Sequence, residues 1–267
     1  KTGNTGTMTI SPDPNDTLSK TTHRTTKQSR GTLQSTNPAI TNTNAISVII
    51  DHSGSMTGGP LDAAKNSSII MIDLIDLWGN ELFPQQIGNM NLQYIQFGGK
   101  GEFNVIHQLG LLSNQNKLRK DILGSGTTYG NTDFSSGLNE ALKQLKGKSF
   151  NNKTIFLTDG GDLGTGPNAG KNQYTDLVET KFIIYNNPNA SVKQKGWLQA
   201  VPNGSEFHVN SEYEVLSHFV KTLFAFVDDI DYYLVRQGNQ NIDVGQTFKL
   251  FKHSNNKENM LILSKPQ

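Results

Sequence analysis

Cysteine is absent from the 267 residues, and neither sign of charge is in excess, because 24 Lys and Arg residues balance 23 Asp and Glu residues. The lack of cysteine excludes disulfides, zinc–thiolate sites and cysteine nucleophiles, and it is compatible with either redox compartment. The formal net charge is +1, and no run of basic residues is interleaved with aromatics. We therefore expect no nucleic-acid partner.

Long uninterrupted apolar runs are lacking as well. The most apolar stretch, residues 215–235, is broken by Lys221, Asp228, Asp229 and Asp231. A membrane-spanning helix needs about 20 predominantly apolar residues, so this pattern predicts a buried helix instead. We expect no direct membrane insertion in the visible chain.

The composition leaves the compartment open. Only 18% of the residues are charged, while Asn, Thr, Ser and Gly are plentiful. Such a surface leans towards a secreted or cell-surface protein, although an AT-rich genome would also enrich Asn, Lys and Ile, and a cytoplasmic protein is compatible too. The sequence begins with Lys1 rather than Met, so a signal segment or a longer upstream region could be missing from view.

Strand-like and helix-like segments alternate along the middle of the chain. This order predicts an α/β fold with a doubly wound, mostly parallel sheet and helices on both faces. The turn Gly98-Gly99-Lys100-Gly101 predicts a hairpin, and hence one antiparallel edge strand. The expected strands are residues 46–50, 91–97, 102–109, 153–158, 181–185 and 206–209, and the expected helices are residues 61–78, 132–145, 191–200 and 212–227.

Three parts are expected along the chain. Residues 1–43 form a flexible polar leader with a short strand at 7–10, and residues 44–229 form the α/β domain. Residues 230–267 contain three strand-like segments, which predict either a small β appendage or the start of a further domain.

The junction after the first strand carries the most specific chemistry. Asp51-His52-Ser53-Gly54-Ser55 directly follows a run of β-branched apolar residues. Alternate side chains of an extended turn point the same way, so Asp51, Ser53 and Ser55 can converge on one point. Oxygen ligands of this kind suit a hard divalent cation. The alternative is an Asx-type turn that caps the next helix.

Two further segments have the same character. The strand at 153–158 ends in Asp159 and is followed by Gly160-Gly161-Asp162. A glycine-containing loop with Thr132-Asp133-Phe134 leads into a helix between the two strands. In a doubly wound sheet, ligands bind beyond the carboxyl ends of the strands where the strand order reverses, so Asp51 and Asp159 are expected at one rim.

These three segments resemble, in order, the motifs of the von Willebrand factor A (VWA) family, whose metal-ion-dependent adhesion site opens with Asp-x-Ser-x-Ser. The resemblance covers about residues 44–229 and implies a Mg²⁺ or Mn²⁺ site, with Ca²⁺ as an alternative. For the second loop, Thr132 is preferred because an apolar helical pattern follows it, and Thr128 stays open as the alternative. The resemblance assigns the metal ligands to Asp51, Ser53, Ser55, Thr132 and Asp159.

Two neighbouring residues receive no role in this site. His52 is interpreted as a surface residue, because hard cations favour oxygen ligands. Asp162 is the only spare carboxylate expected near the rim, and it is interpreted as a solvated loop residue.

The resemblance implies a binding module rather than an enzyme, in which an Asp or Glu carboxylate of a protein partner completes the coordination of the ion. One alternative is a metal-assisted hydrolase, but the three loops contain no basic residue, and no phosphate-binding glycine motif follows a strand and opens a helix. Another alternative is a constitutive scaffold subunit of a larger bacterial complex. The sequence identifies neither the partner nor the oligomeric state.

Overall fold

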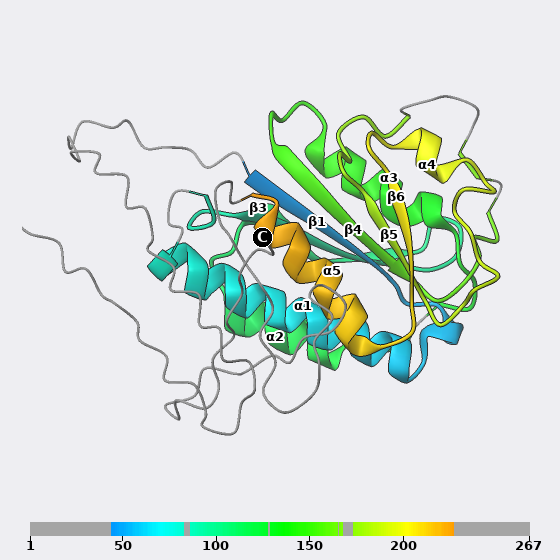
Figure 1. Ribbon diagram of the computed structural model, residues 1–267, viewed down its shortest axis with the longest axis horizontal. Helices are drawn as coiled ribbons and strands as arrows, with labels where there is room; N and C mark the ends of the chain where they lie inside the picture. Colours follow the sequence, from blue (N-terminus) through cyan, green and yellow to red (C-terminus); the bar gives the residue numbers. More distant parts are fainter. Residues whose placement is uncertain (1–43, 83–85, 128, 165, 168–172, 227–267) are drawn as a thin grey trace, which may run out of the picture. The chain divides into compact units, whose positions relative to one another are not determined.

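Within the described residues, six strands form one sheet in the order β3-β2-β1-β4-β5-β6 (Figure 1). The four pairs among β2, β1, β4, β5 and β6 are parallel, whereas β3 runs antiparallel to β2 at the edge. This confirms the predicted fold class. The computed structural model describes residues 44–82, 86–127, 129–164, 166–167 and 173–226.

The strands match the predicted segments closely, and β2 and β5 match residue for residue. For β1, β2, β4 and β5, burial explains why the sequence identifies them, because β-branched and aromatic side chains favour strands that are covered on both faces. The strands are β1 (Asn44–Asp51), β2 (Asn91–Phe97), β3 (Phe103–Leu111), β4 (Asn151–Thr158), β5 (Lys181–Tyr185) and β6 (Ser205–Val209).

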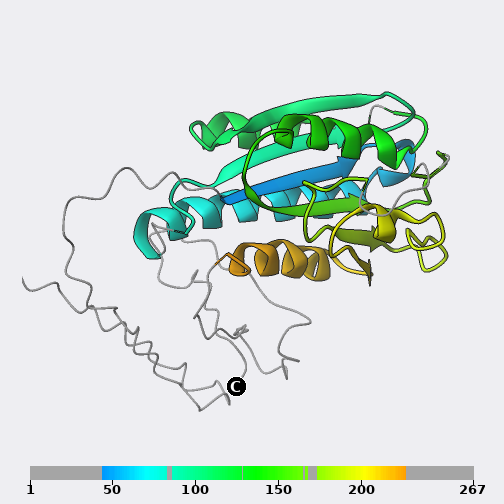
Figure 2. The ribbon, with the colours of Figure 1, turned by 90° about the horizontal axis from the view of Figure 1, so that it is seen from above.

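Helices cover both faces of the sheet. α1, α2 and α5 lie on one face and α3 and α4 on the other (Figure 1). α1 and α5 lie side by side (Figure 2). The ring centroids of Trp78, directly after α1, and Phe224 of α5 lie 4.7 Å apart. The helices are α1 (Gly59–Leu77), which continues as a π-helical turn (Trp78–Leu82), α2 (Gln115–Gly124), α3 (Phe134–Leu145), α4 (Trp197–Ala200) and α5 (Glu212–Phe224), and a 3₁₀ turn (Gly54–Met56) follows β1.

Aromatic rings fill the layer between the sheet and α3. Phe156 of β4 packs against Phe97, Phe134 and Phe182, with ring centroids 4.8, 4.7 and 5.2 Å away. All four side chains are buried, and each such burial contributes about 1.5–3 kcal/mol. This layer fixes the start of α3 above the ends of β1 and β4.

One predicted helix needs correction, and one helix was not predicted. The helix expected over 191–200 is present only as α4, because residues before it form turns. Glu206 Oε2 accepts hydrogen bonds from the amides of Val192 and Lys193 at 2.7 and 3.1 Å, and Gly196 has a positive φ of 77°. α2 was not predicted, although Asn114 accepts the Lys117 amide at 3.0 Å as an N-cap.

The described chain begins and ends at the same end of the sheet. Lys153 pairs with Ile46 near the start of β1, and its Nζ lies 5.2 Å from the centre of the Phe226 ring. The predicted leader at 1–43 and the predicted β segments of 230–267 lie outside the described residues. Within the described part, no helix combines the length and the apolar character needed to cross a bilayer.

Candidate metal site at the carboxyl ends of β1 and β4

The candidate site begins with Asp51, the last residue of β1. Its side chain is fully buried. Oδ1 accepts the Ser53 amide at 2.8 Å, and Oδ2 accepts the Thr158 hydroxyl at 2.6 Å. Because β1 and β4 are parallel neighbours, these bonds fix the carboxylate between the two strand ends where the winding of the sheet reverses.

Hydrogen-bonded hydroxyl groups link the first loop, which follows β1, to the third loop, which follows β4. Ser53 Oγ and Ser55 Oγ lie 3.1 Å apart, and Ser55 Oγ donates to Asp159 Oδ1 at 2.9 Å. A Cβ atom placed on Gly160 would lie 3.9 Å from Ser55 Oγ and 4.0 Å from Thr132 Oγ1. The fold therefore brings Asp51, Ser53, Ser55 and Asp159 together through hydrogen bonds, and Thr132 reaches the same rim from the second loop.

The second loop is held by the backbones of its neighbours. Tyr129 pairs with Ser53 in an isolated parallel bridge, and the Asp133 amide donates to Gly98 O at 2.7 Å. A side chain at Gly98 would overlap the Tyr129 ring, since its Cβ would lie 2.0 Å from Tyr129 Cβ. Glycine is required there by this close approach. Thr128, the alternative to Thr132, lies outside the described residues.

His52 is buried, and its interpretation as a surface residue was wrong. Its side chain is 0% exposed, and Nδ1 donates to Gly126 O at 2.8 Å. Its own amide donates to Phe97 O at 2.8 Å, and its carbonyl accepts the Tyr129 amide at 3.3 Å. Burial lowers the pKa of His52 to about 4, so the ring is neutral and joins the first loop to the second.

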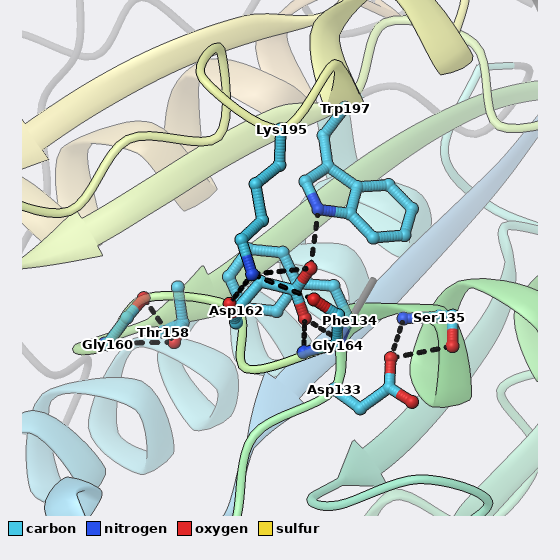
Figure 3. Close-up of polar contacts among 9 residues, drawn as sticks. All are labelled: Asp133, Phe134, Ser135, Thr158, Gly160, Asp162, Gly164, Lys195 and Trp197. Carbon is cyan, nitrogen blue, oxygen red and sulfur yellow. Dashed lines mark hydrogen bonds and ion pairs between the residues drawn. The ribbon is translucent and has the colours of Figure 1, made fainter. Parts of the chain in front are cut away.

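Asp162 is also buried rather than solvated, and this corrects the second interpretation. It is 6% exposed and accepts the Phe134 amide, the Gly164 amide and the Trp197 indole N–H (Figure 3). Trp197 lies 35 residues further along the chain, so no local pattern signals this contact. Thr158 was predicted only as the end of a strand at this rim, and no role in this region was predicted for Lys195 or Trp197.

Burial makes the carboxylates of the site costly to ionise. It raises the pKa of Asp51 to about 6, against the lowering effect of the Thr158 and Ser53 hydrogen bonds, and the nearby Asp159 adds a smaller increase. Burial also raises the pKa of Asp159, while the Ser55 hydrogen bond opposes it. In the described residues, the hydrogen bonds to both carboxylates come from hydroxyls and an amide rather than from a lysine or arginine. A cation at this rim would favour both charged forms.

The available ligand atoms are oxygens only. Among the described residues, no three His, Asp or Glu side chains cluster where they could hold a metal ion. The candidate set instead combines two carboxylates with three hydroxyls. Asp51, Ser53 and Thr132 are buried, whereas Ser55 is exposed and Asp159 is partly exposed. Such a set fits a hard divalent cation with one open side.

Comparison with known proteins shows the class of fold. No family model and no curated protein matches the sequence. Among solved structures, a von Willebrand factor type A protein from Catenulispora acidiphila is similar, with a TM-score of 0.52, 16% identity, and coverage of 72% of this chain and 45% of that one. The pilus adhesin SpaC from Lactobacillus rhamnosus GG has a TM-score of 0.52 and 16% identity, over 74% of this chain and 34% of that one.

A third similar structure is the PilB minor pilin from Streptococcus sanguinis, with a TM-score of 0.50, 14% identity, and coverage of 71% of this chain and 63% of that one. The chain thus spans less than two thirds of each of these three proteins. The fold of the described residues is VWA-like.

Proposed function

We propose that this chain is a protein-binding module that depends on a divalent cation, Mg²⁺ or Mn²⁺ with Ca²⁺ as the alternative. Asp51, Ser53, Ser55, Thr132 and Asp159 would hold the ion. The observation that carries the proposal is the convergence at one sheet rim of a buried carboxylate, Asp51, with hydroxyls and a second carboxylate, Asp159. The bound ion would supply the positive charge that recognises a partner's Asp or Glu carboxylate.

The exposure of the site supports a partner that arrives from solvent. Ser55 and Asp159 lie at the open side, whereas Asp51 forms the buried back. Two similar structures are a pilus adhesin and a minor pilin, and this likeness supports a role in adhesion or assembly through protein contacts. A constitutive scaffold subunit would use the same site with a partner that stays bound.

A hydrolase finds no specific support in the described residues. Lys195 does reach the third loop from outside the predicted motifs, but its amine donates to Gly164 O at 2.8 Å and to Asp162 O. It therefore serves the loop backbone rather than a substrate. Hydrolysis of a generic phosphoester by the full chain, lost in Asp159→Ala, would favour this alternative over a binding module.

The ion is tested by thermal unfolding of the full chain in Mg²⁺, in Mn²⁺ and in EDTA. Binding to the folded state should stabilise it by about 2.7 kcal/mol at 100 times the dissociation constant. Asp51→Asn should abolish this gain, and Asp76→Asn, which removes an exposed carboxylate on α1, should retain it. Equal gains in the two variants would contradict the assignment of Asp51.

The partner is tested with a displayed peptide library selected on immobilised chain in Mg²⁺ and eluted with EDTA. The selected peptides should contain Asp or Glu, and their Asn or Gln counterparts should not bind. Peptides that remain bound in EDTA, or that bind Asp51→Asn equally well, would refute the proposed role of the ion.

A further inference from the structure

Asp162 lies at the centre of a buried polar cluster beside the candidate metal site (Figure 3). Its Oδ1 accepts the amides of Phe134 at 3.1 Å and Gly164 at 3.0 Å. Its Oδ2 accepts the indole N–H of Trp197 at 3.0 Å and lies 3.8 Å from Lys195 Nζ. One carboxylate therefore joins the start of α3, the loop after β4 and the segment at the start of α4.

The segments joined by Asp162 carry two of the proposed ligands. Phe134 follows Thr132 by two residues, and Asp162 follows Asp159 by three. The two loops also meet directly, because the Leu163 amide donates to Thr132 O at 2.9 Å. The position of Thr132 relative to Asp159 is thus set through residues adjacent to Asp162.

Lys195 and Trp197 hold the carboxylate from the other side. Trp197 is fully buried, and its ring lies 5.9 Å from that of Phe134 and 6.0 Å from that of Tyr174. The Lys195 amine binds the backbone carbonyls of Asp162 and Gly164. A buried charge is tolerated when it is hydrogen-bonded and paired, as Asp162 is here.

The remaining contacts at the start of α3 show what Asp162 adds. Asp133 caps the helix by accepting the Ser135 amide at 3.0 Å and the Ser135 hydroxyl at 2.6 Å. The Phe134 amide is left for Asp162. Asp133 therefore stabilises the helix from within its own loop, whereas Asp162 ties that helix to the third loop.

We propose that Asp162, held by Trp197 and Lys195, is a positioning residue that sets the second loop against the third, and so places Thr132 and Asp159 for the same ion. This inference rests on the proposed function. Asp162 contacts neither the ion nor a partner, and acts through the Phe134 amide and the Leu163–Thr132 bond. Loss of an outer residue of this kind lowers metal affinity by about 10–100-fold.

The first test measures the Mn²⁺ affinity of the full chain by calorimetry. Asp162→Asn keeps an acceptor for the Phe134 and Gly164 amides but turns an N–H group towards the Trp197 indole and the Lys195 amine. We expect the dissociation constant to rise by about 10–100-fold. The matched control is Glu140→Gln. It removes a different buried carboxylate, which lies on α3 and is bound to Lys143 and Gln144. The Mn²⁺ dissociation constant of this variant should equal that of the wild type.

The second test does not use the metal. In EDTA, hydrogen exchange of the Leu163 amide reports directly on its bond to Thr132 O. Asp162→Asn should lose protection at Leu163, and Glu140→Gln should keep it. If Asp162 had a purely structural role, Asp162→Asn would lower the overall stability without this selective loss of protection at Leu163.

Trp197→Phe provides a variant that keeps the carboxylate and removes only one of its donors. Its Mn²⁺ dissociation constant should lie between those of the wild type and Asp162→Asn. Constants equal to the wild type in both variants overturn the proposal. If Asp162→Asn does not fold, an unchanged constant in Trp197→Phe alone overturns it. Failure of the wild type to bind Mn²⁺, Mg²⁺ and Ca²⁺ refutes the proposed function instead, so the two failures are distinguishable.

Discussion

Gly137 lies inside α3, where glycine is normally unfavourable, and the sheet beneath it explains its presence. A Cβ atom at this position would lie 2.6 Å from Ile49 Cγ2 and 3.0 Å from Phe97 Cδ1. The absent side chain lets the helix approach the ends of β1 and β2, and this approach brings the second loop to the candidate site. Gly137 is needed because it has no side chain and so allows the helix to come close to the sheet, and not because glycine can adopt unusual backbone angles.

We expect Gly137→Ala to destabilise the protein by about 1–3 kcal/mol, because overpacking outweighs the gain in helix propensity. Gly124→Ala at the last residue of α2 is the matched control, since nothing lies within 4 Å of its Cβ position. Its effect should stay within about 0.5 kcal/mol. Urea unfolding of both variants measures the difference, and equal effects would contradict the close packing of α3.

At the scale of elements, α5 depends on how it begins. Ser211 Oγ accepts the Glu214 amide at 3.3 Å, and Glu214 Oε2 accepts the Ser211 amide at 3.1 Å, which together form a capping box. The side chain of Glu212, in the first turn, also accepts the Asn66 amide group of α1 at 2.7 Å. The capped turn therefore aligns α5 along α1.

Ser211→Ala should lower the free energy of unfolding by about 1 kcal/mol, because the Glu214 amide loses its acceptor. Ser211→Asn should restore most of the loss, since Asn is an equally good N-cap residue. Chemical denaturation with both variants provides the measurement. If Asn and Ala destabilise the protein equally, the cap does not control α5.

The elements also show how far the sequence determines the fold. Strands with apolar residues on both faces could be predicted because burial itself requires that composition, and β2 and β5 were predicted with correct limits. α2 was not predicted, because only Leu118 and Ile122 of its ten residues are buried. Residues 191–196 were wrongly predicted as helix because Glu206 of β6 binds the amides of Val192 and Lys193.

The candidate site shows the same division between features set by the local sequence and features set by contacts with other parts of the chain. Asp51 and Asp159 could be placed at one rim because Asp51 ends one buried strand and Asp159 directly follows another, and parallel neighbouring strands end together. His52 and Asp162 could not be assigned correctly, since their burial depends on Gly126 and Trp197, 74 and 35 residues away. The binding of an ion by these residues, and the identity of that ion, stay predictions.

At the scale of the whole molecule, a partly buried histidine, His218, couples stability to pH. Burial, together with smaller contributions from the charges of Lys181 and Lys221, lowers the pKa of His218 from 6.5 to about 4. Between pH 6.5 and 4 the unfolded state therefore binds a proton that the folded state does not. The free energy of unfolding contributed by His218 falls as the pH falls through this window.

His218→Phe should flatten the dependence of stability on pH between 6.5 and 4, and it retains a ring against Phe207, whose centroid lies 4.2 Å away. Urea unfolding in EDTA across this window, for wild type and variant, gives the difference due to His218. His52 acts in the same direction and Asp51 in the opposite one, and both are present in each protein. Parallel pH profiles would contradict the lowered pKa of His218.

Asn44 and Phe226 both lie at the end of the sheet where the parallel strands begin, and this determines how the molecule is oriented when it is attached there. β1 has eight residues, which at about 3.3 Å each separate this end from the loop rim by roughly 26 Å. If a solid support were attached at residue 44 or residue 226, the sheet would lie between the support and the rim. Asp51, Thr132 and Asp159 would then face away from the attachment. Attachment at residue 44 or residue 226 would therefore direct the candidate site away from the support.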